Sequence, residues 1–167
     1  MKAECALDPN IGTTGGGAHL VRGSGFVYAR DDATGSVKSS SEATRLLVVE
    51  DDFLLATEAE AALQDAGYDV GEIAASAEDA LNAAASEPFT LVVMDIRLAS
   101  RMDGIDCAVE LFKRYGLRCI FATAHYDDET RRRAEPAQPL GWLHKPYRTS
   151  SLVMAVRDAL DRLRTRR

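Results

Sequence analysis

Short apolar runs recur along the chain from residue 45 onward, and each ends at polar or charged residues. The strongest runs lie at residues 46–49, 91–94 and 118–122. Runs this short, without alternating polar residues, are typical of strands buried on both faces in a parallel sheet. Weaker runs predict two more strands, at residues 70–74 and 140–143.

The stretches between these runs carry apolar residues at the spacing of one helix face. They predict helices at residues 53–66, 76–86, 105–115, 127–134 and 151–164. Gly67 and Gly116 stop the first and third helices, because glycine readily adopts the left-handed conformation that ends helices. Ser76 and Asp79 have the spacing of a capping box at the start of the second. This alternation predicts an α/β fold, in which right-handed crossovers place helices on both faces of a doubly wound, five-stranded parallel sheet.

Residues 1–44 differ from the rest of the chain in composition. They hold seven of the twelve glycines and a run of serines at residues 39–41. Such a segment buries little apolar surface, so we expect a flexible Gly/Ser-rich extension over residues 1–44 and a folded domain over residues 45–167. The extension is either a tail that binds a partner or an upstream stretch included by the choice of start codon.

Overall composition narrows the class of protein. The chain has no apolar run near the roughly 20 residues of a membrane-spanning helix, and Lys2 is not followed by the apolar stretch of a signal peptide. We therefore expect a cytoplasmic protein without membrane contact. The net charge of -6 argues against direct binding of nucleic acid. Cys107 and Cys119 lie in apolar patterns and are expected to be core side chains.

Polar residues that could take part in binding or catalysis cluster where the predicted strands end. They are Glu50 and Asp51 after the first strand, Asp95 after the third, Thr123 after the fourth and Lys145 after the fifth. The carboxyl ends of parallel strands share one edge of the sheet, where ligand sites form. We therefore expect these side chains to meet in one pocket.

Three carboxylates in one pocket repel one another unless a cation compensates them. Mg²⁺ prefers oxygen ligands and keeps several waters, so a few carboxylates and a phosphate suit it. Such a pocket also suits phosphoryl transfer to a carboxylate, because metal and donors neutralise the phosphoryl oxygens. In this interpretation Asp95 is the nucleophile, while Asp51 and Glu50 hold Mg²⁺, Glu50 directly or through water. Lys145 supplies a positive charge and Thr123 a hydroxyl donor.

The segments around these residues resemble the motifs of the response-regulator receiver family. They are residues 48–52 (VVEDD), 93–95 (VMD), 121–124 (FATA) and 145–147 (KPY). Together they follow the family's order over residues 45–164. The resemblance implies a flavodoxin-like sheet in strand order 2-1-3-4-5. It also implies phosphorylation of Asp95 by a histidine kinase or histidine phosphotransfer protein, Mg²⁺ dependence and slow hydrolysis of the acyl phosphate. Beyond these reactions on itself, it implies no enzymatic activity.

The resemblance gives roles to further positions. Arg97 would offer its backbone carbonyl to Mg²⁺. Trp142 stands where the family has a switch aromatic, which turns inward when the threonine moves. The bond between Lys145 and Pro146 is often cis in the family. Trp142 is bulkier than the usual Tyr or Phe, and a plain surface aromatic is the alternative interpretation of it.

Two features near the pocket have other interpretations. Asp52 is expected to cap the first helix rather than to bind metal. The loop after Asp95 has Ala99 where the family often has Pro, and its Asp103-Gly104 pair comes one residue later than usual. We expect such a loop to affect the choice of kinase or the lifetime of the phosphoryl group.

The leading functional hypothesis is a receiver without an output domain, because little chain follows residue 164. Its output is then contact with an unknown downstream protein, or traffic of phosphate to another protein. The fourth helix, fifth strand and fifth helix form the expected contact face and a candidate homodimer surface. A second hypothesis is a constitutive interaction module that does not use phosphate. A third is an aspartate-dependent phosphatase, whose motif has an acid where this chain has Arg97.

Overall fold

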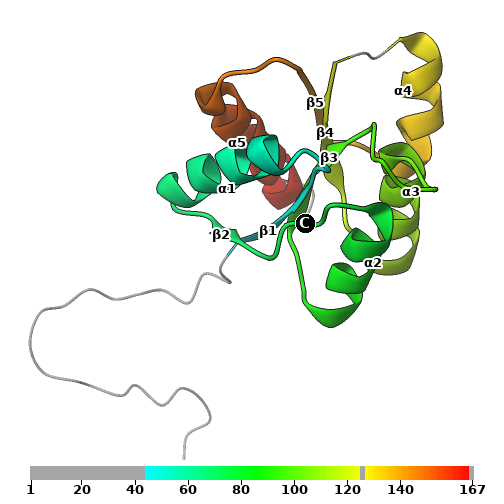
Figure 1. Ribbon diagram of the computed structural model, residues 1–167, viewed down its shortest axis with the longest axis horizontal. Helices are drawn as coiled ribbons and strands as arrows, with labels where there is room; N and C mark the ends of the chain where they lie inside the picture. The colour runs from blue at the N-terminus through cyan, green and yellow to red at the C-terminus, as the bar shows by residue number, and fades with distance from the viewer. Residues whose placement is uncertain (1–43, 125–126, 166–167) are drawn as a thin grey trace, which may run out of the picture. The chain divides into compact units, whose positions relative to one another are not determined.

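The computed structural model describes residues 44–124 and 127–165 of the chain (Figure 1). In these residues, five parallel strands form one sheet in the order β2-β1-β3-β4-β5. They are β1 (Arg45–Val49), β2 (Asp69–Val70), β3 (Leu91–Asp95), β4 (Cys119–Thr123) and β5 (Gly141–His144). The expected strand order and α/β fold class are therefore confirmed. The extension expected over residues 1–44 lies outside the described residues, except for Thr44.

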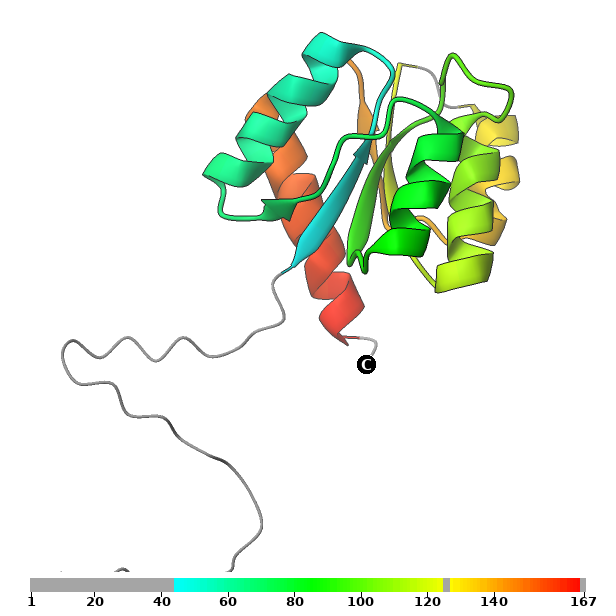
Figure 2. The same ribbon diagram turned by 60° about the horizontal axis from the view of Figure 1, so that its bottom comes forward.

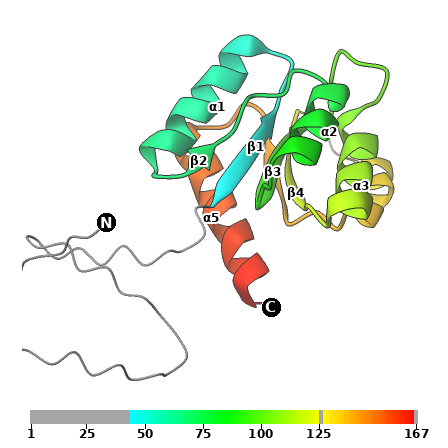
Figure 3. The same cartoon turned by 90° about the horizontal axis from the view of Figure 1, so that it is seen from below.

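Helices cover both faces of this sheet, as Figures 2 and 3 show. One face carries α1 (Phe53–Asp65) and α5 (Thr149–Thr165), which contact each other. The other carries α2 (Ala77–Ser86), α3 (Gly104–Tyr115) and α4 (Asp128–Ala134), followed by the 3-10 helix η1 (Glu135–Ala137). Every expected helix is present, with ends within two residues of the prediction. None of the described helices is long and apolar enough to cross a membrane.

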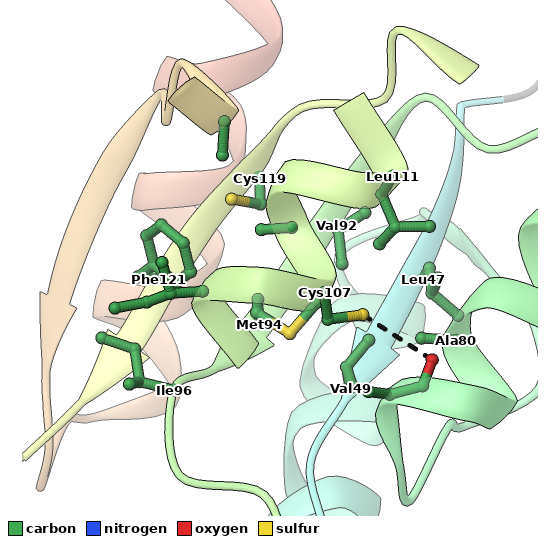
Figure 4. Packing of buried hydrophobic residues seen from close by; sticks show 14 of the residues in the cluster. Leu47, Val49, Ala80, Val92, Met94, Ile96, Cys107, Leu111, Cys119 and Phe121 are labelled. Atoms are coloured by element: carbon green, nitrogen blue, oxygen red, sulfur yellow. Dashed lines mark hydrogen bonds between the residues drawn. The ribbon is translucent and has the colours of Figure 1, made fainter. Parts of the chain in front are cut away.

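Alternate residues of the central strands face opposite sides of the sheet and divide the core into two layers. Leu46 and Val48 of β1 belong to the layer that includes buried residues of α1 and α5. Leu47 and Val49 belong to the layer that includes buried residues of α2 and α3. Figure 4 shows this second layer from close by. Because both faces are covered, the strand ends are the part of the sheet left open for a site.

Cys107 and Cys119 are buried in the second layer (Figure 4), as the sequence predicts. The thiol of Cys107 on α3 donates a weak hydrogen bond to the carbonyl oxygen of Ala77 on α2, with 3.7 Å between sulfur and oxygen. Both cysteines are free thiols. Their role in the structure is to fill the core.

β2 is shorter than the sequence predicts. A strand was expected over residues 70–74, but only Asp69 and Val70 pair with β1 in regular register. Ala74 forms an isolated bridge with Val49 instead. β2 lies at one edge of the sheet and pairs with β1 alone. A local apolar pattern does not reveal where that pairing stops.

Side chains cap the first turns of four helices. The caps are Asp52 for α1, Ser76 for α2, Asp103 for α3 and Asp127 for α4. Ser76 Oγ accepts a hydrogen bond from the N–H of Asp79 and donates one to its carboxylate, which is a variant of the predicted capping box. The caps of α1 and α3 fix the backbone just after β1 and just after the loop that follows β3, beside the strand ends.

Candidate functional site

The strand ends hold polar side chains that are buried far more deeply than such groups usually are. Asp95, the last residue of β3, is 8% exposed, and Glu50, directly after β1, is 6% exposed. Thr123, the last residue of β4, is 1% exposed. Acidic residues are rarely buried unless they are paired, because removing their charge from water is costly. The site must therefore contain a compensating cation.

Lys145 is that cation. Its ammonium donates hydrogen bonds to Asp95 Oδ2 at 2.7 Å and to Glu50 Oε2 at 2.5 Å. Its backbone N–H donates to the carbonyl oxygen of Thr123 at 2.8 Å, so β4 fixes the backbone from which the side chain extends. The bond between Lys145 and Pro146 is cis, as the family resemblance implies. Lys145 is thus part of the site and not a solvated lysine.

Burial and hydrogen bonds shift the pKa values of Glu50 and Lys145. Burial raises the pKa of Glu50 above its ordinary value, the hydrogen bond from Lys145 opposes that rise, and the charge of Asp95 adds to it. Burial acts to lower the pKa of Lys145, but its hydrogen bonds to Asp95 and Glu50 outweigh this effect and raise it. Lys145 therefore remains a cation at neutral pH, shared between two acids.

A third acid completes the cluster. One carboxylate oxygen from each of Glu50, Asp51 and Asp95 lies within 4.8 Å of the other two. One lysine does not neutralise three carboxylates, and an oxygen-only donor set of this kind fits Mg²⁺ better than softer metals. The residues present thus fit the metal that the family resemblance implies.

The loop between β3 and α3 closes over this cluster through backbone donors. The N–H of Arg97 donates to Asp95 Oδ1 at 3.1 Å, and the N–H of Ala99 donates to Asp51 Oδ2 at 3.0 Å. Sequence reasoning noted that Ala99 replaces a common proline but did not predict this bond. The signal was available, because replacing proline creates a backbone donor that the usual residue lacks.

Trp142 lies at the border of the core. It is half-buried on β5, pairs in register with Phe121, and its ring centroid is 4.8 Å from the Phe121 ring. The guanidinium of Arg131 on α4 lies 6.0 Å from the centroid of the same ring. Trp142 is therefore not a plain surface aromatic, because its ring contacts a core residue on one side and a cation of α4 on another.

Asp52 has the position expected of a helix cap. Its Oδ1 accepts hydrogen bonds from the N–H of Leu54 at 2.9 Å and from that of Leu55 at 3.2 Å. Those contacts direct its carboxylate to the first turn of α1 and leave Glu50 and Asp51 as the acids of this segment that gather with Asp95.

A cavity of about 380 Å³ lies beside the cluster, between the first turns of α1 and the segment from β5 to α5. Its lining comprises Leu55, Glu58, Ala59, Ala124, Lys145, Pro146, Tyr147 and Thr149. Burial raises the pKa of Tyr147 above its ordinary value. The sequence places Tyr147 in the KPY motif at residues 145–147 but does not show that its ring lines a cavity.

Known proteins are similar to this chain over most of its described residues. A family model of the response regulator receiver domain matches residues 46–157. The transcriptional regulatory protein PdtaR of Mycobacterium tuberculosis is 30% identical over 120 residues, which cover 72% of this chain and 58% of that protein. The phyllosphere-induced regulator PhyR of Methylorubrum extorquens is 28% identical over 130 residues, which cover 77% of this chain and 48% of that protein. The chain thus spans about half the length of these relatives.

Solved structures agree with this assignment. A CheY-like response regulator receiver domain protein of Methanospirillum hungatei has a TM-score of 0.69 at 28% identity, covering 74% of this chain and 98% of that one. The signal receiver domain of a modulated diguanylate cyclase from Desulfovibrio desulfuricans has a TM-score of 0.68 at 30% identity, with the same coverage of 74% and 98%. Because the family model matches residues 46–157, this chain belongs to the response regulator receiver domain family.

Proposed function

We propose that this receiver domain is a phosphorylation switch whose acceptor is Asp95. The observation that carries the proposal is the convergence of charged groups on Asp95 from the ends of β1 and β5: Glu50, Asp51 and Lys145. Such a site combines a carboxylate nucleophile, a cation for the phosphoryl oxygens and ligands for a divalent metal. The phosphoryl donor is the phosphohistidine of a histidine kinase or of a histidine phosphotransfer protein.

The transfer exchanges one bond to phosphorus for another. An oxygen of Asp95 forms the new bond while the bond to the donor's imidazole nitrogen breaks, and its electron pair returns to the imidazole. The N–H of Arg97 and the ammonium of Lys145 hold the two carboxylate oxygens of Asp95 at 3.1 Å and 2.7 Å. These donors orient the nucleophile before the phosphoryl group arrives, which lowers the entropic cost of reaching the transition state.

Lys145 and Thr123 then interact with the transferred group. The ammonium that pairs with Asp95 before transfer has the charge to pair with phosphoryl oxygens afterwards. The hydroxyl of Thr123, at the buried end of β4, is the donor that follows the phosphoryl group. Movement of Thr123 is coupled in this proposal to Trp142, the switch aromatic on the neighbouring strand.

Glu50, Asp51 and Asp95 would hold Mg²⁺, with the backbone carbonyl of Arg97 as a further oxygen ligand. When bound, Mg²⁺ supplies the positive charge that reduces repulsion between the carboxylate nucleophile and the phosphoryl oxygens. Without it, three acids and one lysine leave the site with excess negative charge, which disfavours a phosphoryl donor. The proposal therefore makes the reaction dependent on Mg²⁺.

The output of the switch is contact with a downstream protein or traffic of phosphate to another protein. The contact face comprises α4, β5 and α5, which is also the surface for a homodimer. The packing of Arg131 on α4 against Trp142 on β5 supports this choice, because it joins the switch aromatic to that face. Sizing the protein with and without a phosphodonor would reveal a dimer that depends on phosphorylation.

Intact-mass analysis tests the chemistry. We expect incubation with Mg²⁺ and a small phosphodonor such as acetyl phosphate to add one labile phosphoryl group to the wild-type protein. Chelation of Mg²⁺ and the Asp95→Asn variant should both prevent this, whereas Asp52→Asn, which changes an acid outside the cluster, should not. No adduct on the wild-type protein, or an adduct that survives Asp95→Asn, would contradict the proposal.

The same variants separate this function from its alternatives. A constitutive interaction module would bind its partner equally well with Asp95→Asn and without Mg²⁺. An aspartate-dependent phosphatase would hydrolyse an external phosphomonoester over many turnovers, whereas the switch catalyses only its own phosphorylation and slow dephosphorylation. Either result would replace the proposal.

A further inference from the structure

The backbone amide of Ala99 makes a contact that bears on the acidic cluster. It donates to Asp51 Oδ2 at 3.0 Å, joining two positions 48 residues apart in the chain. A proline at this position could not make the bond, because proline lacks the N–H. The contact therefore depends on the residue type at position 99, although only backbone atoms of that residue take part.

The loop that carries this amide is held on both sides of Ala99. On the preceding side, the N–H of Arg97 donates to Asp95 Oδ1 at 3.1 Å, and Leu98 is buried in the core layer that contains α2 and α3. On the following side, Ser100 Oγ donates to the carbonyl oxygen of Met102 at 2.7 Å. Contacts on both sides of the amide thus hold the backbone that presents it.

The end of the loop is also fixed. Asp103 caps α3 through the N–H of Asp106, and its carboxylate pairs with Arg133 of α4 at 2.6 Å. The N–H of Gly104 donates to the carbonyl oxygen of Ile96 at 2.9 Å, which closes the loop on itself. These contacts reduce the entropy that the loop must lose when its amide orients another group.

Asp51 is the member of the acidic cluster that needs orienting. It is exposed, whereas Glu50 and Asp95 are buried and bonded to Lys145. An exposed aspartate has several accessible rotamers, and selecting one of them costs free energy when a metal binds. A hydrogen bond to one carboxylate oxygen selects the rotamer in advance and leaves the second oxygen for the metal.

We infer that Ala99 is a positioning residue for the Mg²⁺ site, whose amide holds the carboxylate of Asp51 ready for the ion. The inference rests on the proposed function, since it assumes that Asp51 is a Mg²⁺ ligand. Groups that hydrogen-bond to ligating carboxylates and orient them commonly contribute tenfold or more to metal affinity. The opposite effect, in which the amide competes with the ion for the carboxylate, predicts tighter Mg²⁺ binding when the amide is removed.

Ala99→Pro is the test, with Ala99→Ser as its matched control, because serine keeps the backbone N–H. Mg²⁺ titrations followed by amide chemical shifts give dissociation constants for weak as well as tight binding. We expect Ala99→Pro to weaken Mg²⁺ binding roughly tenfold and Ala99→Ser to leave it unchanged. Equal or tighter binding by Ala99→Pro would overturn the inference.

A double-mutant cycle with Asp51→Asn tests whether Ala99 acts through Asp51. Asp51→Asn removes the charged ligand, so adding Ala99→Pro to it should not weaken Mg²⁺ binding further. An undiminished effect of Ala99→Pro in that background would overturn the inference. Thermal unfolding without Mg²⁺ is the readout for a purely structural role, and we expect the midpoints of Ala99→Pro and Ala99→Ser to agree.

Hydrogen exchange provides a test that does not need the proline variant to fold. In the wild-type protein without Mg²⁺, the Ala99 amide should be protected from exchange, and Asp51→Ala should remove that protection. An unprotected Ala99 amide in the wild type would overturn the inference. If the wild type binds no Mg²⁺ at all, the proposed function fails. If it binds through Asp51 with an affinity that Ala99→Pro leaves intact, only the role of Ala99 fails.

Discussion

A Cβ atom on Gly104 would lie 1.8 Å from the backbone carbonyl oxygen of Asp95. The first residue of α3 thus packs directly against the backbone of the proposed phosphoryl acceptor. No side-chain rotation relieves such an overlap, because the backbone fixes the position of a Cβ atom and the oxygen is itself a backbone atom. The close approach explains why α3 begins with glycine just after its cap, Asp103.

Gly104→Ala should therefore disturb both stability and the site. Because α3 or the end of β3 must shift to admit the methyl group, we expect the free energy of unfolding to fall by about 1–3 kcal/mol. Phosphorylation of Asp95 by acetyl phosphate should also slow. Urea unfolding and intact-mass time courses measure the two effects.

Gly141→Ala on β5 is the control for this substitution. Its Cβ would lie 3.5 Å from Ile120 Cγ2, an ordinary van der Waals distance, so we expect little change in stability. Equal losses of stability in Gly104→Ala and Gly141→Ala would show that the overlap with Asp95 does not cause the loss at position 104.

Removing the cap of α1 should weaken the fold without removing an acid from the cluster. Asp52→Ala leaves the N–H groups of Leu54 and Leu55 without their acceptor, and such losses typically cost about 1 kcal/mol. Asp52→Asn keeps an acceptor oxygen and should retain most of that stability. Urea unfolding of both variants measures the difference, and similar losses in the two would contradict the capping role.

The buried thiol of Cys107 predicts a loss of stability at alkaline pH. Burial raises its pKa from 9.0 to about 12, and the charges of Glu78 and Asp103 add to the rise. The folded protein therefore keeps a proton that the unfolded chain releases above pH 9.0, so stability falls as pH increases from 9.0 toward 12. Urea unfolding across this range should show a shallower fall for Cys107→Ala than for the wild type. Parallel curves would mean that this thiol does not contribute.

Trp142 is the protein's one tryptophan and reports on its own environment. If it is the switch aromatic, phosphorylation should alter its stacking with Phe121 and its contact with Arg131, and so change its fluorescence. We expect acetyl phosphate with Mg²⁺ to change the emission of the wild type but not of Asp95→Asn. Unchanged emission from protein that carries the phosphoryl adduct would show that Trp142 stays in place.

Much of this molecule follows from local sequence. The strand runs, the helix spacing, the caps at Ser76 and Asp52 and the burial of Cys107 and Cys119 all depend on residues near one another in the chain. The gathering of Glu50, Asp51, Asp95 and Lys145 also followed from sequence, because parallel strands place their carboxyl ends at one edge of the sheet.

Other features depended on how distant segments meet. The hydrogen bond from Ala99 to Asp51 requires the path of the loop after β3 relative to the end of β1, and the early end of β2 reflects its place at the sheet's edge. The sharing of Lys145 between Glu50 and Asp95 likewise arises from contacts between different elements at the carboxyl ends of the strands. So does the approach of Gly104 to Asp95. A periodic pattern records which face of an element is buried. It does not record distances between elements, so only the tertiary structure determined which groups touch Asp51 and Asp95.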